Sequence, residues 1–122
     1  MELNSGEKYG GNLINNKKEG KGIIKYTNGD EYDGNWKDDN KECEGIMKYN
    51  NGEEYNGNWK EDKRNGYGTF KYLDGIYEGE WENNEYNGKG KIILNNNDIY
   101  EGNFKDWKKI EYLKLIVIIN IY

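Results

Sequence analysis

Apolar and polar residues alternate in short stretches of this chain. Between Tyr55 and Trp59 (YNGNW), the rings and Gly57 occupy every second position, and asparagines lie between them. Successive side chains of a β-strand point to opposite faces, so this spacing puts the rings and the glycine on one face. A helix would need apolar spacings of three and four residues and would be destabilised by so many glycines. The pattern therefore predicts short, half-buried strands.

The same pattern recurs with a period of 22 or 23 residues. Each copy starts with a tyrosine, which is followed by a glycine two places later and by a large apolar residue four places later. A Gly-x-Gly pair, a second aromatic position and a turn glycine complete most copies. A fixed period of this length is typical of a repeat architecture. The copies start at Tyr9, Tyr32, Tyr55, Tyr77 and, as a partial copy, Tyr100.

The period divides the chain into an N-terminal lead-in (1–8), a repeat array (9–107) and a divergent apolar tail (108–122). The tail either caps the array with a β-branched strand or marks a truncated end of the coding sequence. Left exposed, its LIVII segment would be prone to aggregation, which favours the cap.

Each repeat is predicted to be a β-hairpin. A three-residue loop at 27–29, with Gly29 in the left-handed conformation, pairs Ile24 with Tyr32 and Gly22 with Gly34. The rings and glycines of both strands then share a face. The predicted fold is all-β: an open, elongated and twisted antiparallel meander of repeated β-hairpins.

The third repeat is one residue shorter than the others at this turn. With the same loop type, the deletion would turn every following side chain to the other face. We expect a two-residue loop of Asp74 and Gly75, which pairs Tyr72 with Tyr77 and leaves the faces unchanged.

Aliphatic residues are scarce before the tail, whereas tyrosine and tryptophan are abundant. A strand glycine leaves bare backbone over which a neighbouring ring can lie. We therefore expect a core of rings packed on glycines.

The motif Tyr-x-Gly-x-Trp, then Gly-x-Gly, then Tyr-x-x-Gly resembles the MORN repeat (membrane occupation and recognition nexus), over about residues 9–104. The resemblance implies an open meander of hairpins and a non-catalytic scaffold at membrane–cytoskeleton junctions. It also implies binding of partner proteins and a link to phosphoinositide lipids. Such repeats also occur beside catalytic domains, among them phosphatidylinositol-phosphate kinases and SET-domain methyltransferases. Cys43 and Asn97 at glycine positions, and Leu13 and Leu94 at aromatic positions, depart from the pattern.

The sequence gives little support for catalysis. The chain has no histidine, Ser5 is its only serine, and Cys43 has no base partner to activate it. The Gly-Lys-Gly pieces at 20–22 and 88–90 lack the context of a phosphate loop, and the carboxylates lack calcium-loop spacing. We expect no enzyme activity, no cofactor and no metal.

The net charge restricts the classes of partner that we expect, and the cysteine content indicates the cellular compartment. The net charge of −5 disfavours nucleic acid. A single cysteine allows no intramolecular disulfide, and no apolar leader follows Met1. We expect a cytoplasmic protein, peripheral at a membrane or at the cytoskeleton.

A single-layer sheet is expected to leave ring edges uncovered, and exposed aromatic patches mark interaction sites. The primary prediction is an aromatic-glycine groove that binds a protein partner, either a helix or peptide or a second copy of this chain. Its residues are Tyr32, Trp36, Tyr55, Trp59, Tyr72, Tyr77, Trp81, Tyr100 and Phe104.

The first alternative is peripheral binding to anionic, phosphoinositide-bearing membranes through a basic loop edge. Acidic residues in the same loops favour a merely solvated edge. The second alternative is a regulatory fragment of a larger enzyme, such as a phosphatidylinositol-phosphate kinase. The residues of the basic edge are Lys17, Lys18, Lys41, Lys63, Arg64, Lys108 and Lys109.

Overall fold

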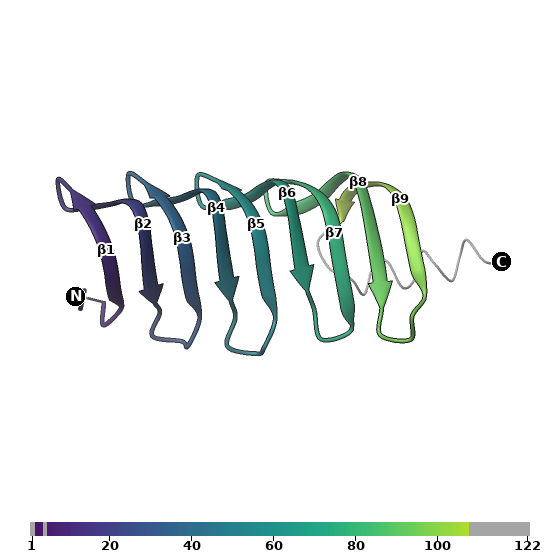
Figure 1. Cartoon of the computed structure of the whole chain (residues 1–122), viewed down its shortest axis with the longest axis horizontal. Coiled ribbons are helices and arrows are strands. Elements are labelled where there is room, and N and C mark those ends of the chain that lie inside the picture. Colours follow the sequence, from purple (N-terminus) through teal and green to yellow (C-terminus); the bar gives the residue numbers. More distant parts are fainter. Residues whose placement is uncertain (1, 4, 108–122) are drawn as a thin grey trace.

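The computed structural model describes residues 2–3 and 5–107, which form one antiparallel sheet (Figure 1). Strands adjacent in sequence are adjacent in the sheet, so the predicted meander of hairpins is confirmed. The tail, and with it the predicted cap, lies outside the described residues. The strands are β1 (Lys8–Ile14), β2 (Lys17–Lys25), β3 (Glu31–Lys37), β4 (Asn40–Lys48), β5 (Glu54–Lys60), β6 (Lys63–Lys71), β7 (Gly75–Glu82), β8 (Glu85–Leu94) and β9 (Ile99–Trp107).

Two kinds of loop alternate along the sheet. Two-residue loops at 15–16, 38–39, 61–62 and 83–84 form the upper edge in Figure 1, and the loops after β2, β4, β6 and β8 form the lower edge. Both residues of each upper loop have positive φ, as the twist of a tight hairpin requires.

The register of the first lower loop is as predicted. Ile24 faces Tyr32 and Gly22 faces Gly34. Gly29 has φ of 96°, and the Tyr26 N–H donates to the Asp30 carbonyl at 2.9 Å. The prediction of a three-residue loop is confirmed.

The predicted loop of the third repeat is wrong. The two loop residues are Leu73 and Asp74, because the Tyr72 N–H donates to the Gly75 carbonyl at 2.8 Å. Consequently Phe70 faces Tyr77, whereas we expected Tyr72 to do so. The observed register keeps Gly68 opposite Gly79, in line with the glycine pairs of the other repeats. The expected register would have placed the Phe70 side chain against this glycine row.

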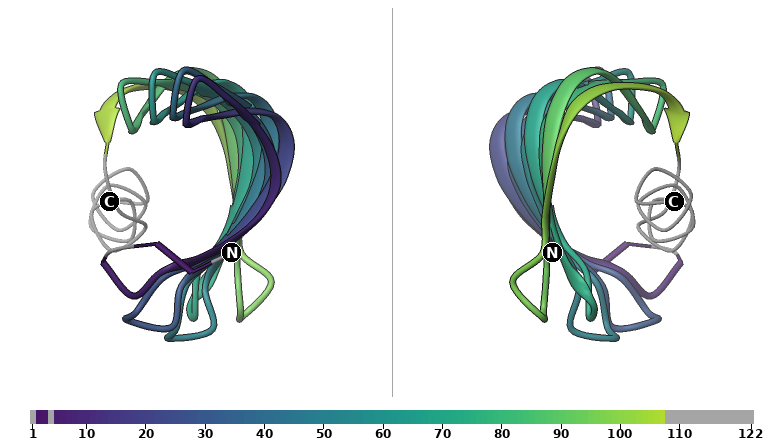
Figure 2. Two further views of the ribbon diagram at one scale, coloured as in Figure 1. Left: turned by 90° about the vertical axis from the view of Figure 1, so that its left-hand side faces the viewer. Right: turned by 90° about the vertical axis from the view of Figure 1, so that its right-hand side faces the viewer.

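The sheet bends strongly, so that end-on views show a C-shaped section (Figure 2). The register shifts beside Gly34, Gly57 and Gly79, within the β3–β4, β5–β6 and β7–β8 pairs. Such bulges bend a strand and increase its twist. The bulged strands carry Cys43, Gly66 and Gly88 at these points, all with positive φ.

One face of the sheet forms the core. Side chains on the inside of a curved layer converge and cover one another, whereas those on the outside diverge. Near-complete burial therefore places the rings on the inner face, and no residue of this core is charged. The buried residues are Tyr9, Ile24, Tyr32, Trp36, Met47, Tyr55, Trp59, Phe70, Tyr77, Trp81, Tyr86, Ile92 and Phe104.

Candidate partner-binding face

Tyrosine rings lie directly on the glycine row. A Cβ atom at Gly68 would lie 2.5 Å from Cζ of Tyr55, so only glycine fits beneath this ring. The Tyr55 hydroxyl reaches across and donates to the Asn58 carbonyl at 2.8 Å. Tyr32 and Tyr77 make the equivalent hydrogen bond in their own repeats. The expected packing of rings on bare backbone is present.

Tryptophans connect each repeat to the one before it. The indole Nε1–H of Trp59 donates to the Gly45 carbonyl at 3.1 Å, and that of Trp81 donates to the Gly68 carbonyl at 3.0 Å. Each indole also packs edge-on against tyrosines of its own repeat and of the preceding one.

A cation covers the rings in each of the first three repeats. Nζ of Lys18 lies 5.0 Å from the Trp36 ring centroid, and Nζ of Lys41 lies 5.4 Å from that of Trp59. Cζ of Arg64 lies 5.0 Å from the Trp81 ring centroid. These are cation–π distances. Burial lowers the pKa of the Lys41 ammonium, an effect that the Asp62 carboxylate opposes.

Tyr86 holds the corresponding place in the fourth repeat. Its ring stacks on Tyr77 with the centroids 3.8 Å apart, and its hydroxyl donates to the hydroxyl of Tyr72. The cation series on this face therefore ends at Arg64 within the described residues.

The expectation of exposed ring edges is wrong for most of the predicted groove. Neighbouring rings and the cations cover them, so their accessible fraction is 5% or less. Tyr72 and Tyr100 are half-buried. The buried members are Tyr32, Trp36, Tyr55, Trp59, Tyr77, Trp81 and Phe104.

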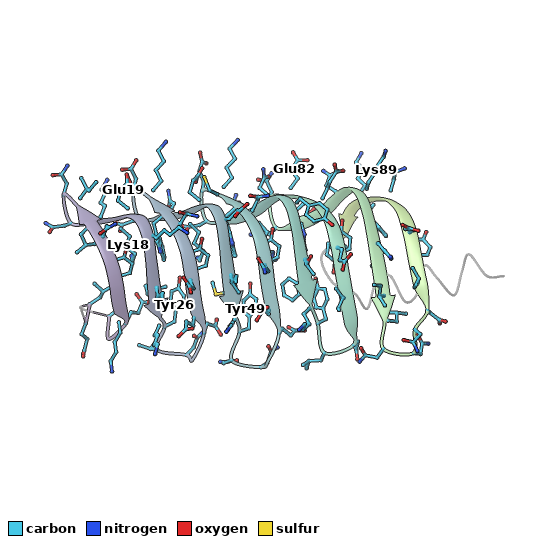
Figure 3. The ribbon with its side chains drawn as sticks, viewed as in Figure 1. Lys18, Glu19, Tyr26, Tyr49, Glu82 and Lys89 are labelled. Carbon is cyan, nitrogen blue, oxygen red and sulfur yellow. The ribbon has the colours of Figure 1, made fainter. Side chains whose placement is uncertain are left out.

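A second row of tyrosines remains partly accessible on the inner face. Tyr26, Tyr49 and Tyr72 immediately precede the lower loops and are half-buried against the core. Figure 3 shows Tyr26 and Tyr49 at equivalent places in successive hairpins, with Glu19 and Glu82 toward the upper edge. Burial, and then the nearby Glu7 carboxylate, raise the pKa of Tyr26 to about 12. Tyr26 and Tyr49 occupy the second aromatic position of their repeats, and the predicted groove did not include them.

The predicted basic edge is not continuous. Lys18, Lys41 and Arg64 are half-buried over rings of the inner face, so they do not form one exposed row with the other basic residues of the predicted edge. Lys17 and Lys63 remain exposed. Lys108 and Lys109 lie outside the described residues.

Acidic side chains of the upper loops bind the preceding repeat. Oδ1 of Asp39 accepts the backbone N–H of Lys18 at 2.7 Å, and this hydrogen bond is the main reason why the pKa of Asp39 is lowered. Oδ1 of Asp62 accepts the N–H of Lys41 at the same distance. These carboxylates hold repeats together, which a solvated surface charge would not do.

Cys43 occupies a bulge with φ of 57° and is exposed. In the part of the chain that the structure describes, no three His, Cys, Asp or Glu residues are grouped so that they could hold a metal ion. Nor do the described residues include a helix long and apolar enough to cross a membrane.

The comparisons with known proteins agree with this architecture. The family model described as the MORN repeat matches residues 9–31, 32–54, 55–76 and 77–99. A search of curated proteins found no match. Proteins with MORN repeats often bind membranes or other proteins. Because the four matched segments cover most of the sequence and coincide with the hairpins described above, the chain belongs to the MORN-repeat family.

Proposed function

We propose that this protein is a non-catalytic scaffold that binds a protein partner along the inner face of its curved sheet, at a membrane–cytoskeleton junction. The observation that carries the proposal is the row of half-buried tyrosines on that face, Tyr26, Tyr49 and Tyr72. Tyr26 lies beside the Lys41 ammonium, and the Tyr49 hydroxyl accepts a hydrogen bond from Arg64. Tyrosine and arginine are enriched at protein interfaces, and a tyrosine ring supplies a large contact area at a small cost in conformational entropy.

The repeat distance favours a helix as the bound element. One repeat adds two strands to the sheet, or about 9.5 Å along its length. A helix rises by about 1.5 Å per residue, so roughly six to seven residues span one repeat. A helix with a seven-residue apolar period, lying along the sheet, would present an equivalent side chain to each successive tyrosine.

The test places a photo-crosslinking amino acid at position 26 or 49 of the full chain in its native cells. Tyr67, which is 59% exposed and lies on the outer face, is the matched control position. We expect positions 26 and 49 to crosslink to one protein to which position 67 does not crosslink. The same crosslinks should form when the purified partner is mixed with the purified chain. Equal crosslinking from both faces, or none from the inner face, would refute the proposal.

Membrane binding through the upper edge is the competing function. Co-sedimentation with phosphatidylserine and phosphoinositide vesicles at low and raised salt tests it, because electrostatic binding weakens with screening. Charge reversal at the exposed Lys17 and Lys63 should then abolish the binding. If the chain is a regulatory part of a larger enzyme, the crosslinked partner in the same experiment would be a catalytic protein, or the chain isolated from the cells would be longer than the given sequence.

A further inference from the structure

The cations on the inner face are Lys18, Lys41 and Arg64. The first two have a carboxylate partner, and Arg64 in the third repeat has none among the described residues. Nζ of Lys18 lies 3.5 Å from Oδ1 of Asp39, and Nζ of Lys41 lies 3.7 Å from Oδ1 of Asp62. Asn84 stands at the corresponding place beside Arg64, and its Oδ1 accepts the Arg64 backbone N–H at 2.9 Å. The loop geometry is therefore retained while the negative charge is missing.

Arg64 is half-buried, and the hydrogen bonding of its guanidinium is incomplete. Nη1 donates to the Tyr49 hydroxyl at 3.1 Å, and Nη2 donates to the Asn84 carbonyl at 3.2 Å. Its Nε–H is buried and has no acceptor among the described residues, and no described carboxylate lies within 4.0 Å of the guanidinium. A guanidinium has five N–H donors, and an enclosed charge without a counter-ion is costly.

We infer that Arg64 is the binding site for a carboxylate, supplied by an aspartate or glutamate side chain of the protein partner. The inference rests on the proposed function and names the chemistry that the partner must present. A carboxylate can accept two parallel hydrogen bonds from a guanidinium, and Nη1 and Nη2 of Arg64 each keep one N–H besides those given to Tyr49 and Asn84. Tyr49, which touches Nη1, forms the accessible aromatic surface beside it.

A lipid head group fits this position less well. Arg64 lies on the inner face against Phe70 and Trp81, whereas a flat bilayer would first meet the loops and their exposed lysines. Lys18 and Lys41 are already paired within the chain, so Arg64 gives one repeat a preference that the others lack. The acidic residue of the partner would pair with Arg64 and so fix the alignment of the partner helix, that is, which of its seven-residue segments contacts which repeat.

The test uses a library of 21-residue helical peptides. Each peptide carries Leu or Tyr at every seventh position, and the remaining surface positions are varied between Glu and Gln. They are selected on the immobilised full chain. We expect Glu to be enriched at one position. The purified Glu peptide should then bind at least ten times more tightly than its Gln twin.

Asn84→Asp provides the decisive variant, because it supplies within the chain the counter-ion that Asp39 and Asp62 supply elsewhere. It should reduce the Glu-to-Gln ratio to near one while the circular dichroism spectrum stays unchanged. Asn83→Asp is the matched control: it adds the same charge one residue away and should leave the ratio intact. Arg64→Gln should also remove the preference.

The outcomes separate this inference from the proposed function. Peptides that bind without a Glu preference, or an equal loss in Asn83→Asp and Asn84→Asp, overturn the role of Arg64 alone. Failure to retain any peptide overturns both. Binding of anionic vesicles that Arg64→Gln abolishes would assign the site to a lipid head group instead.

Discussion

The glycine row offers a direct test of how the sheet is packed, through the substitution Gly57→Ala. A Cβ atom at Gly57 would lie 2.7 Å from the Tyr67 carbonyl oxygen and 2.8 Å from the Tyr55 hydroxyl, and it would also clash with Cα of Gly68. Two of these atoms belong to the backbone of β6, so the strands must separate or Tyr55 must move. Overpacking costs about 1–3 kcal/mol. Loss of the hydrogen bond between Tyr55 and Asn58 adds about 1 kcal/mol.

The free energy of unfolding should therefore fall by about 2–4 kcal/mol. With a urea dependence of about 2 kcal/mol per molar, the unfolding midpoint should fall by about 1–2 M. Tryptophan fluorescence reports the transition, because Trp59 and Trp81 both lie against Tyr55.

Gly102→Ala is the matched control, since Gly102 holds the same repeat position and a Cβ there would meet no atom of the described residues within 4 Å. Its free energy of unfolding should stay within about 0.5 kcal/mol of that of the parent. If both alanine variants lose the same stability, the cost arises from glycine conformation or strand propensity, and the reasoning from close contact is refuted.

Two further predictions follow from the bulges and from the tyrosines. Cys43→Gly should raise the free energy of unfolding by about 1 kcal/mol, because a non-glycine residue at φ of 57° is strained. Urea titration measures this gain, and an equal gain in Cys43→Ala would contradict the prediction. The contribution of Tyr26 to stability should be constant from neutral pH to about pH 10 and should fall as the pH rises toward 12. Burial raises the pKa of the Tyr26 hydroxyl from 10.0 to about 12, so this hydroxyl loses its proton first in the unfolded chain. Urea midpoints at about pH 9 and 11 that coincide would contradict the second prediction.

Much of the architecture is local in origin and follows from the sequence. The alternation from Tyr55 to Trp59 determines which side chains share a face, and Gly29 determines the loop that pairs Ile24 with Tyr32. These features depend on neighbours in the chain, and the repeat applies the same solution to every hairpin.

The burial of the rings and the position of the cations depend on the curvature of the sheet. The alternation of apolar and polar residues does not determine that curvature. Bulges at positions such as Cys43 bend the sheet, so rings of adjacent repeats converge and cover one another. An indole then reaches the glycine carbonyl of the preceding repeat, and Lys41 lies over a ring of the next repeat. The third lower loop was mispredicted for a related reason, since its register is set by the match of Gly68 with Gly79 across strands. The sequence alone determined the hairpins and their faces; tertiary structure decided which side chains on the inner face remain accessible, because burial depends on how the repeats converge.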